Sequence, residues 1–117
     1  MKFLSLEPFI PSGSNMESAK SFFEELGFTK HWDAGDYAGF ENDSCKFILQ
    51  QYDNKAFAEN LMVSVQVDDV AEFRKTVIEK NLTEKYNIRI STILQQPYGK
   101  EVNVIDQAGV CWHFVQS

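Results

Sequence analysis

The fold is decided by residues 97–116, which read PYGKEVNVIDQAGVCWHFVQ. Two runs rich in β-branched and aromatic residues, 101–106 and 110–116, are separated by the short stretch QAG and preceded by PYGK. Runs of this kind, joined by short connections that contain Gly, are typical of antiparallel strands. The stretch therefore predicts a closing hairpin in which Gly109 supplies the backbone freedom that the turn requires.

Upstream of this hairpin, the sequence predicts a strand, a helix and one more strand. Residues 61–67 form an apolar run, and Asp68 or Asp69 then provides the side-chain oxygen of a helix N-cap. Residues 81–87 are predicted to form a loop, and residues 88–96 a long strand. The apolar stripe of the predicted helix consists of Val70, Phe73, Val77 and Ile78.

The first half of the chain shows the same order. Residues 3–10 predict a strand, and Ser14 or Asn15 supplies an N-cap for a helix that ends at Gly27. The residues of this helix that recur at helical spacing are Met16, Ala19, Phe22, Phe23 and Leu26.

Three short aromatic and β-branched runs follow that helix and predict three antiparallel strands. They lie at residues 28–33, 36–42 and 45–52, and the polar stretch 53–60 is predicted to be a linker. The repeated order predicts an α+β fold in which residues 1–117 form a single domain. Its two tandem βαβββ halves are expected at about residues 1–54 and 60–117. The alternative is an α+β sandwich in which the repeated order is coincidental.

Composition restricts the classes of partner. The formal charge of −6 repels a phosphate backbone, so we expect no nucleic-acid partner. No run approaches the roughly 20 apolar residues of a membrane span, and the first residues lack the features of a signal peptide. We therefore expect a cytoplasmic protein with no membrane partner, in which Cys45 and Cys111 remain thiols.

Three segments resemble a known family. They are NMESAKSFFEELGF at residues 15–28, VQVDDVAEF at residues 65–73, and the closing hairpin itself. Together they resemble the glyoxalase/bleomycin resistance/extradiol dioxygenase superfamily, the vicinal oxygen chelate fold. The chain departs from the family pattern at Tyr98, where Trp is common, and at residues 106–109, where the turn lacks its Pro.

The resemblance implies a curved mixed sheet around a cleft, and four positions that hold a divalent ion in the metal enzymes of the family. These positions fall at Glu7, Leu49, Met62 and His113. Because Leu and Met are not ligands for a hard divalent ion, we expect no metal and no other cofactor. A shift of one residue brings Gln50 into the second position, which leaves open a nonstandard site that uses Gln50 or Glu7.

Strand alternation places Cys111, His113 and Val115 on one face of the last strand, and Trp112 and Phe114 on the other, under the helices. His113 is thus a candidate to bind a ligand or to act as a base. The expected ligand contacts, which are aromatic or carry hydrogen-bonding groups, are Glu7, Trp32, Phe40, Gln51, Met62, Ser64, Tyr98 and His113.

The first hypothesis for function is a small-molecule binding protein that resembles bleomycin-resistance proteins, with a cationic or aromatic ligand and no metal. The resemblance also implies a homodimer. The alternative is a lyase or isomerase of the glyoxalase-like superfamily, acting on a small oxygenated substrate with Glu7 and His113 as acid and base. A third hypothesis is a regulatory module that uses the sheet for partner contacts, so the sequence leaves catalytic activity open.

Overall fold

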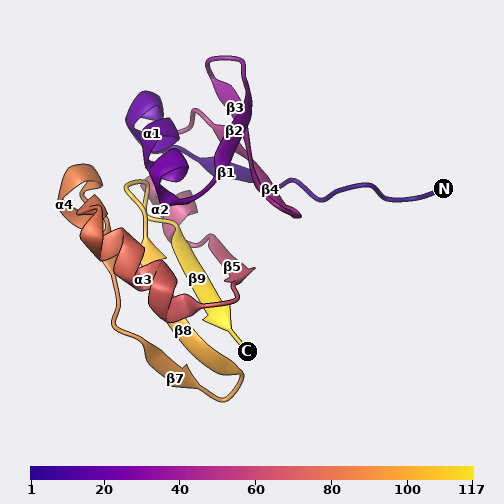
Figure 1. Cartoon of the computed structure of the whole chain (residues 1–117). Helices are drawn as coiled ribbons and strands as arrows, with labels where there is room; N and C mark the ends of the chain where they lie inside the picture. The colour runs from indigo at the N-terminus through magenta and orange to yellow at the C-terminus, as the bar shows by residue number, and fades with distance from the viewer. The chain divides into compact units, whose positions relative to one another are not determined.

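A computed structural model describes all of residues 1–117, and the chain forms two compact units, Met1–Asn54 and Lys55–Ser117. Each unit carries its own mixed sheet (Figure 1). No helix in the chain is both long and apolar enough to cross a membrane.

Unit 1 is a βαβββ module. Strand β1 (Phe9–Pro11) leads to helix α1 (Met16–Leu26) and then to β2 (Thr29–Asp33), β3 (Tyr37–Asn42) and β4 (Cys45–Gln50). The sheet order is β1-β4-β3-β2, and only the β1–β4 pair is parallel. The predicted strand at residues 3–10 is therefore largely wrong, because β1 begins only at Phe9, with the Pro8 carbonyl just before it accepting the Ile48 amide of β4 at 2.9 Å.

Helix α1 begins and ends as the sequence predicts. The side chain of Asn15 accepts a hydrogen bond from the Ser18 amide at 3.0 Å, so Asn15 is the N-cap. Gly27 follows the helix with a φ of 130°, a left-handed conformation that favours glycine. One face of α1 packs on the sheet, where Phe23 contacts Phe40 and Phe47 with ring centroids 5.9 and 5.0 Å apart.

Unit 2 repeats this arrangement with additions. After the short helix α2 (Lys55–Glu59), strand β5 (Met62–Gln66) leads to helix α3 (Val70–Glu79) and helix α4 (Leu82–Tyr86). The remaining strands are β6 (Arg89–Ile90), β7 (Leu94–Gln96), β8 (Gly99–Ile105) and β9 (Cys111–Gln116). The order is β5-β9-β8-β6, with β7 also pairing with β8, and only β5–β9 is parallel.

Helix α3 covers one face of this second sheet. Asp69 is its N-cap and accepts a hydrogen bond from the Glu72 amide at 3.0 Å. Phe73 of α3 stacks on Phe114 of β9 with ring centroids 4.0 Å apart, and Trp112 beside it is buried. This packing confirms that Trp112 and Phe114 lie under the helix.

Three predictions for unit 2 need correction. The expected linker at residues 53–60 contains α2, the expected loop at 81–87 contains α4, and the expected strand at 88–96 is divided at residues 91–93. Ser91 explains the division, because its hydroxyl accepts the Asn103 amide at 2.9 Å and its carbonyl accepts Arg74 Nε at 2.8 Å. The Ser91 hydroxyl and the Arg74 side chain of α3 thus make hydrogen bonds that backbone groups of a neighbouring strand would make in a regular ladder.

The closing turn is organised by a buried carboxylate. Asp106 is 5% exposed and accepts hydrogen bonds from the amides of Ala108, Gly109 and Val110, each at 3.0 Å. Its other oxygen accepts Trp112 Nε1 at 2.9 Å. Burial raises the pKa of Asp106, and these donors oppose that rise. The turn that lacks the family's Pro is therefore held by side-chain hydrogen bonds.

Candidate functional site

The candidate site lies on the face of the unit 2 sheet that helix α3 does not cover, here called the helix-free face of unit 2. The strand register aligns its side chains in rows. One row contains Ser64, His113 and Asn103, and the next contains Val115 and Glu101. Because alternate residues of a strand point to the same face, all five lie on this side of the sheet.

Glu101 is the centre of the site. Its side chain is buried, with the residue 3% exposed. The Tyr98 hydroxyl donates a hydrogen bond to Oε1, and Nδ1 of His113 lies 3.1 Å from Oε2. The Asn103 side chain contributes a third hydrogen bond. A buried carboxylate is costly unless donors surround it, and here three side chains supply them.

The same contacts determine the protonation of the group. The hydrogen bond from Tyr98, followed by those from His113 and Asn103, lowers the pKa of Glu101 against the opposing effect of burial. The hydrogen bond to Glu101 correspondingly raises the pKa of Tyr98. Glu101 is therefore ionised at neutral pH. Burial of the Cys111 thiol, together with the negative charge of Glu101 and Asp106, raises the pKa of that thiol.

Two polar atoms of this site have no hydrogen-bond partner although they are buried. They are Nε2 of His113 and Oδ1 of Asn103. Glu101 holds the other polar end of both side chains, and the two residues lie directly opposite each other on β9 and β8. Both atoms are closed to solvent in this structure, so a bound molecule could reach them only after neighbouring side chains move.

The corresponding face of unit 1, here called the helix-free face of unit 1, is aromatic. Trp32 lies on Gly39, where an added Cβ would fall 2.0 Å from the indole nitrogen. Phe9 and Tyr37 pack edge to face at 5.9 Å, and Gln50 Nε2 lies 3.5 Å from the Tyr37 hydroxyl. Glycine at position 39 is therefore required for the indole to lie flat on the sheet.

The predicted ligand contacts are divided between the units. Met62, Ser64 and His113 share the helix-free face of unit 2, and Tyr98 joins them through Glu101. Trp32 lies on the helix-free face of unit 1. Gln51, which follows β4, is exposed, and its backbone N–H donates a hydrogen bond to the Asp36 carbonyl at 2.8 Å.

Two other predicted ligand contacts, Phe40 and Glu7, lie in unit 1 away from its helix-free sheet face. Phe40 requires correction, because it is 0% exposed and stacks on Phe47 at 5.3 Å in the core of unit 1. Glu7 lies in the segment before β1 and accepts a hydrogen bond from the Ser5 hydroxyl at 2.7 Å. A carboxylate that the sequence prediction did not include, Glu101, contacts His113.

Residues at the family's metal positions do not fit a divalent ion. Leu49 is 0% exposed and points into the core, so Ile48 and Gln50 occupy the helix-free face of unit 1 at that point. Met62 lies on the helix-free face of unit 2 but offers only a thioether, a poor ligand for a hard cation. No group of three or more His, Cys, Asp or Glu side chains is placed to hold a metal ion.

Sequence reasoning missed Glu101 and Asn103, although a signal was present. Asp106 and Val110 form the last backbone hydrogen bond before the turn, and pairing outward from them puts Asn103 opposite His113. Glu101 then falls one row further along the same face. Continuing the hairpin register would therefore have placed both residues beside His113.

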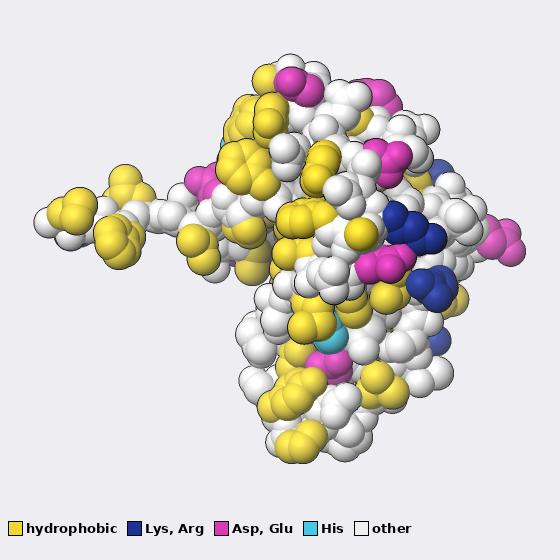
Figure 2. Space-filling view, turned by 180° about the vertical axis from the view of Figure 1, so that it is seen from behind, with side chains coloured by type: hydrophobic (Ala, Val, Ile, Leu, Met, Phe, Trp, Pro, Cys, Tyr) yellow, Lys and Arg dark blue, Asp and Glu magenta, His cyan; other side chains and the backbone are white.

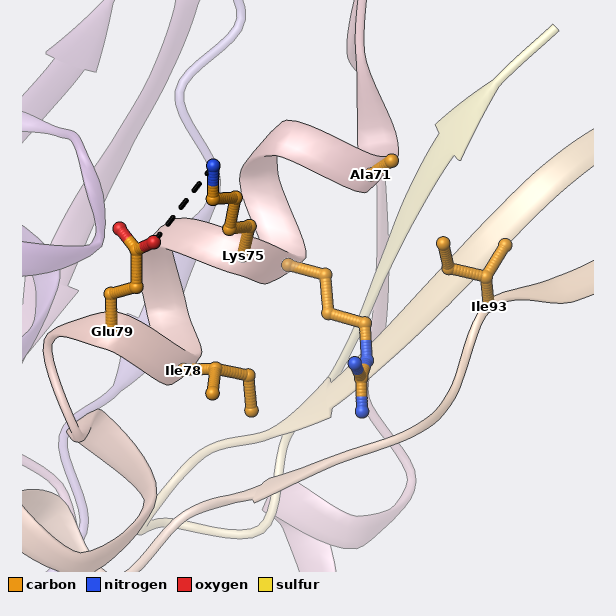
Figure 3. A pocket seen from close by; sticks show the side chains of 6 residues that line it. Ala71, Lys75, Ile78, Glu79 and Ile93 are labelled. Atoms are coloured by element: carbon orange, nitrogen blue, oxygen red, sulfur yellow. Dashed lines mark ion pairs between the residues drawn. The ribbon is translucent and has the colours of Figure 1, made fainter.

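A shallow cavity of about 360 Å³ lies elsewhere in unit 2, beside α3 (Figure 3). Lys75 and Glu79 form an ion pair at 3.9 Å at its rim. None of the predicted ligand contacts lines it. The lining residues are Ala71, Arg74, Lys75, Ile78, Glu79 and Ile93.

Comparison with known proteins identifies the fold. No protein-family model and no curated protein sequence matches the chain. A bleomycin resistance determinant encoded on the transposon Tn5 is similar in structure, with a TM-score of 0.82 at 19% identity over 98% of both chains. The bleomycin-binding protein of Streptomyces verticillus in complex with copper(II)-bleomycin gives 0.76 at 20% identity, covering 100% of this chain and 98% of that one.

A third solved structure has the same architecture. The fosfomycin resistance protein FosX of Listeria monocytogenes, complexed with Mn(II) and sulfate, gives a TM-score of 0.77 at 7% identity. The similarity covers 100% of this chain and 92% of that one. With two βαβββ modules and these structural neighbours, the chain has the fold of the vicinal oxygen chelate superfamily, as its sequence resemblance predicted.

Proposed function

We propose that this protein binds a small molecule on the helix-free face of unit 2, as a sequestering protein of the bleomycin-resistance type and without a metal. The observation that carries the proposal is the pair of buried, unpartnered atoms, His113 Nε2 and Asn103 Oδ1. Buried polar groups in folded proteins are normally hydrogen-bonded, and exceptions mark sites whose partner is a ligand or a water molecule.

The structural neighbours support the same class of function. The Streptomyces verticillus protein was crystallised with copper(II)-bleomycin, and another neighbour is an antibiotic binding protein of Streptomyces sp. CB03234. The net charge of −6 favours a cationic ligand, and the exposed Tyr98 ring of unit 2 suits a ligand that is cationic or aromatic. A cytoplasmic location is part of this proposal.

The proposal is tested by titration calorimetry, in which metal-free bleomycin is added to protein that has been dialysed against a chelator. We expect saturable binding that His113→Ala weakens by at least about tenfold, the scale of one lost hydrogen bond to a buried group. His31→Ala is the matched control, because His31 is the only other histidine and belongs to unit 1. Absence of binding, or equal loss in both variants, would count against the proposal.

A homodimer is the second part of the proposal. The N-terminal segment exposes large apolar side chains, and Figure 2 shows hydrophobic side chains along an extended arm. Phe3, Leu4 and Leu6 are 93%, 90% and 88% exposed. Exposed apolar groups of this kind favour association. Sedimentation velocity should show a dimer, and a monomer at micromolar concentration would contradict this part.

An enzyme is the second candidate function, and the contact between Glu101 and His113 favours it. A carboxylate on Nδ1 leaves Nε2 free to accept a proton from a small oxygenated substrate. The prediction from sequence gave Glu7 and His113 as acid and base, and Glu101, whose Oε2 lies 3.1 Å from His113 Nδ1, is a further candidate for the carboxylate. A lyase or isomerase reaction that begins with removal of a carbon-bound proton would exchange that proton with solvent deuterium, and His113→Ala should abolish the exchange.

A further inference from the structure

Strand β5 is the least protected edge of the two sheets. It lies at one end of its sheet and pairs only with β9. Native proteins usually protect an edge strand by making it short, by placing Pro or charged residues in it, or by a bulge. The edge strands β6 and β7 have two and three residues, β1 contains Pro11, and β2 has Lys30 and an irregular register. Strand β5 has five residues, MVSVQ, and none of these protections.

The backbone groups on the open side of β5 belong to Met62, Ser64 and Gln66. The Leu61 carbonyl and the Val67 amide, on either side of the strand, both form hydrogen bonds with β9. Successive residues of a strand direct their backbone groups to opposite edges, so the even-numbered residues between them face away from β9. These groups form a row of donors and acceptors to which another strand can pair.

The helix-covered face of unit 2 is incompletely closed at the same edge. Val63 and Val65 of β5 lie opposite Trp112 and Phe114 of β9, so they point to the face that α3 covers. Trp112 and Phe114 are buried, whereas both valines are only half-buried. A further strand with two apolar side chains at alternate positions would cover these valines.

Residues 1–7, which read MKFLSLE and are here called the N-terminal arm, have the complementary properties (Figure 2). The arm belongs to no strand, and its own chain leaves Leu4 and Leu6 90% and 88% exposed. At about 3.3 Å per residue, seven residues span roughly 23 Å, which exceeds the roughly 17 Å of a five-residue strand. Pro8 lacks an N–H and therefore ends the stretch that can donate along a ladder.

We propose that the N-terminal arm of a second copy of this chain pairs with the open edge of β5, and that the exchange is reciprocal in a symmetric dimer. This inference rests on the homodimer in the proposed function and names its contact surface. Addition of an extended segment to a sheet edge gains affinity from main-chain hydrogen bonds and specificity from alternate side chains. A symmetric exchange uses both arms and both edges, so the assembly closes at two copies.

The side chains of the arm determine its register. With Ser5 opposite Ser64, Leu4 and Leu6 fall opposite the two half-buried valines, whether the arm runs parallel or antiparallel to β5. A slip by one residue would instead turn both leucines to the helix-free face. In the proposed register, Phe3 of the second copy joins the helix-free face of unit 2 and adds an aromatic side chain beside the candidate site.

Disulfide trapping between two differently tagged, co-expressed chains tests the pairing. One chain carries Ser5→Cys and the other Ser64→Cys, both with Cys45→Ser and Cys111→Ser to remove the native thiols. Directly opposite residues have Cα atoms about 4.5–5.5 Å apart, within the range of a disulfide. We expect a covalent heterodimer after mild oxidation. The matched control, Ser5→Cys with Gln95→Cys on the exposed edge strand β7, should give at least about tenfold less.

Hydrogen exchange gives a second measurement that needs no cysteine variant. In the full chain, at a concentration where it is a dimer, the amides of Met62, Ser64 and Gln66 should exchange slowly. Leu4→Asp combined with Leu6→Asp should speed their exchange at least about tenfold, because the arm then leaves the edge. The other amides of β5, which bond to β9, should stay protected in both proteins.

The outcomes separate this inference from the proposed homodimer. A disulfide yield no higher than that of the control overturns the pairing. So does fast exchange of the open-edge amides in a protein that sediments as a dimer, and the homodimer then stands on another surface. A disulfide that forms only when one chain carries both cysteines places the arm on its own chain and overturns the exchange. If the protein sediments as a monomer, both fail.

Discussion

The two units share one topology but carry different chemistry on their helix-free faces. In unit 1 that face presents Phe9, Trp32 and Tyr37, while in unit 2 it presents a buried carboxylate with its hydrogen-bonded partners. Their helix-covered faces are alike, since Phe23 packs on Phe47 in one and Phe73 on Phe114 in the other. The repeated pattern of buried residues thus specifies the fold twice, and the remaining positions are free to differ in function.

The largest expected effect tests the likeness of the helix-covered faces. Phe23→Ala in unit 1 and Trp112→Ala in unit 2 each remove a buried aromatic ring, with 1% exposure in both cases. Each should lower the free energy of unfolding by about 3–5 kcal/mol, the usual cost of such a deletion. Urea denaturation followed by circular dichroism measures this. A loss below about 1 kcal/mol in either variant would show that the two cores are not equivalent.

Glu101→Gln tests the difference between the helix-free faces. The amide keeps the shape but places a donor against the donors that surround Glu101, so we expect a loss of about 1–3 kcal/mol in unfolding free energy. Glu41→Gln in unit 1 is the control. Its carboxylate is 37% exposed and lies 3.8 Å from Lys46, and we expect a change within about 0.5 kcal/mol. Equal losses of unfolding free energy in the two variants would show that the helix-free faces of the two units do not differ in this way.

Gly39→Ala tests whether Trp32 packs on Gly39 on the helix-free face of unit 1. An added Cβ would overlap the indole of Trp32, which must then leave the sheet. We expect a loss of about 1–3 kcal/mol in unfolding free energy and a red shift in the emission of Trp32. Trp112 is buried in unit 2, so its emission should stay constant. An unchanged spectrum would mean that Trp32 does not rest on Gly39.

The smallest effect is a dependence of stability on pH. The pKa of Glu101 is lowered from its ordinary 4.5, so its contribution is fully present above pH 4.5 and is lost as the pH falls through the folded-state value. The difference in unfolding free energy between the unmodified protein and Glu101→Gln should therefore narrow on acidification. Urea melts between neutral pH and about pH 3 measure the difference. A gap that stays constant would contradict the role given to the carboxylate.

Much of the fold could be predicted because local signals agree with tertiary packing. Asn15 and Asp69 cap their helices, and the apolar stripes lie on the sheets as the helical period requires. The errors occur where long-range pairing decides. Residues 3–7 alternate in part like a strand but belong to no strand of the sheet, which is entered only at Pro8 and Phe9. The Ser91 hydroxyl accepts the Asn103 amide where the strand is interrupted at residues 91–93.

The candidate site was predictable only in part. His113 and Tyr98 were recognisable as a strand histidine and a turn aromatic, but their common partner Glu101 looked like any solvated strand carboxylate. Its place beside His113 follows from the register of β8 against β9, but its burial depends on tertiary packing that no local pattern reports. Phe40 illustrates the converse, because its aromatic character suggested a ligand contact while its neighbours place it in the core.

The central claim is that the helix-free face of unit 2 binds the ligand. Amide chemical-shift mapping of the ¹⁵N-labelled protein during titration with metal-free bleomycin tests it most directly. The claim predicts the largest shifts at Glu101, Asn103 and His113, with little change at Lys75 beside the α3 cavity. Shifts confined to residues lining that cavity, or the absence of any shift, would contradict it.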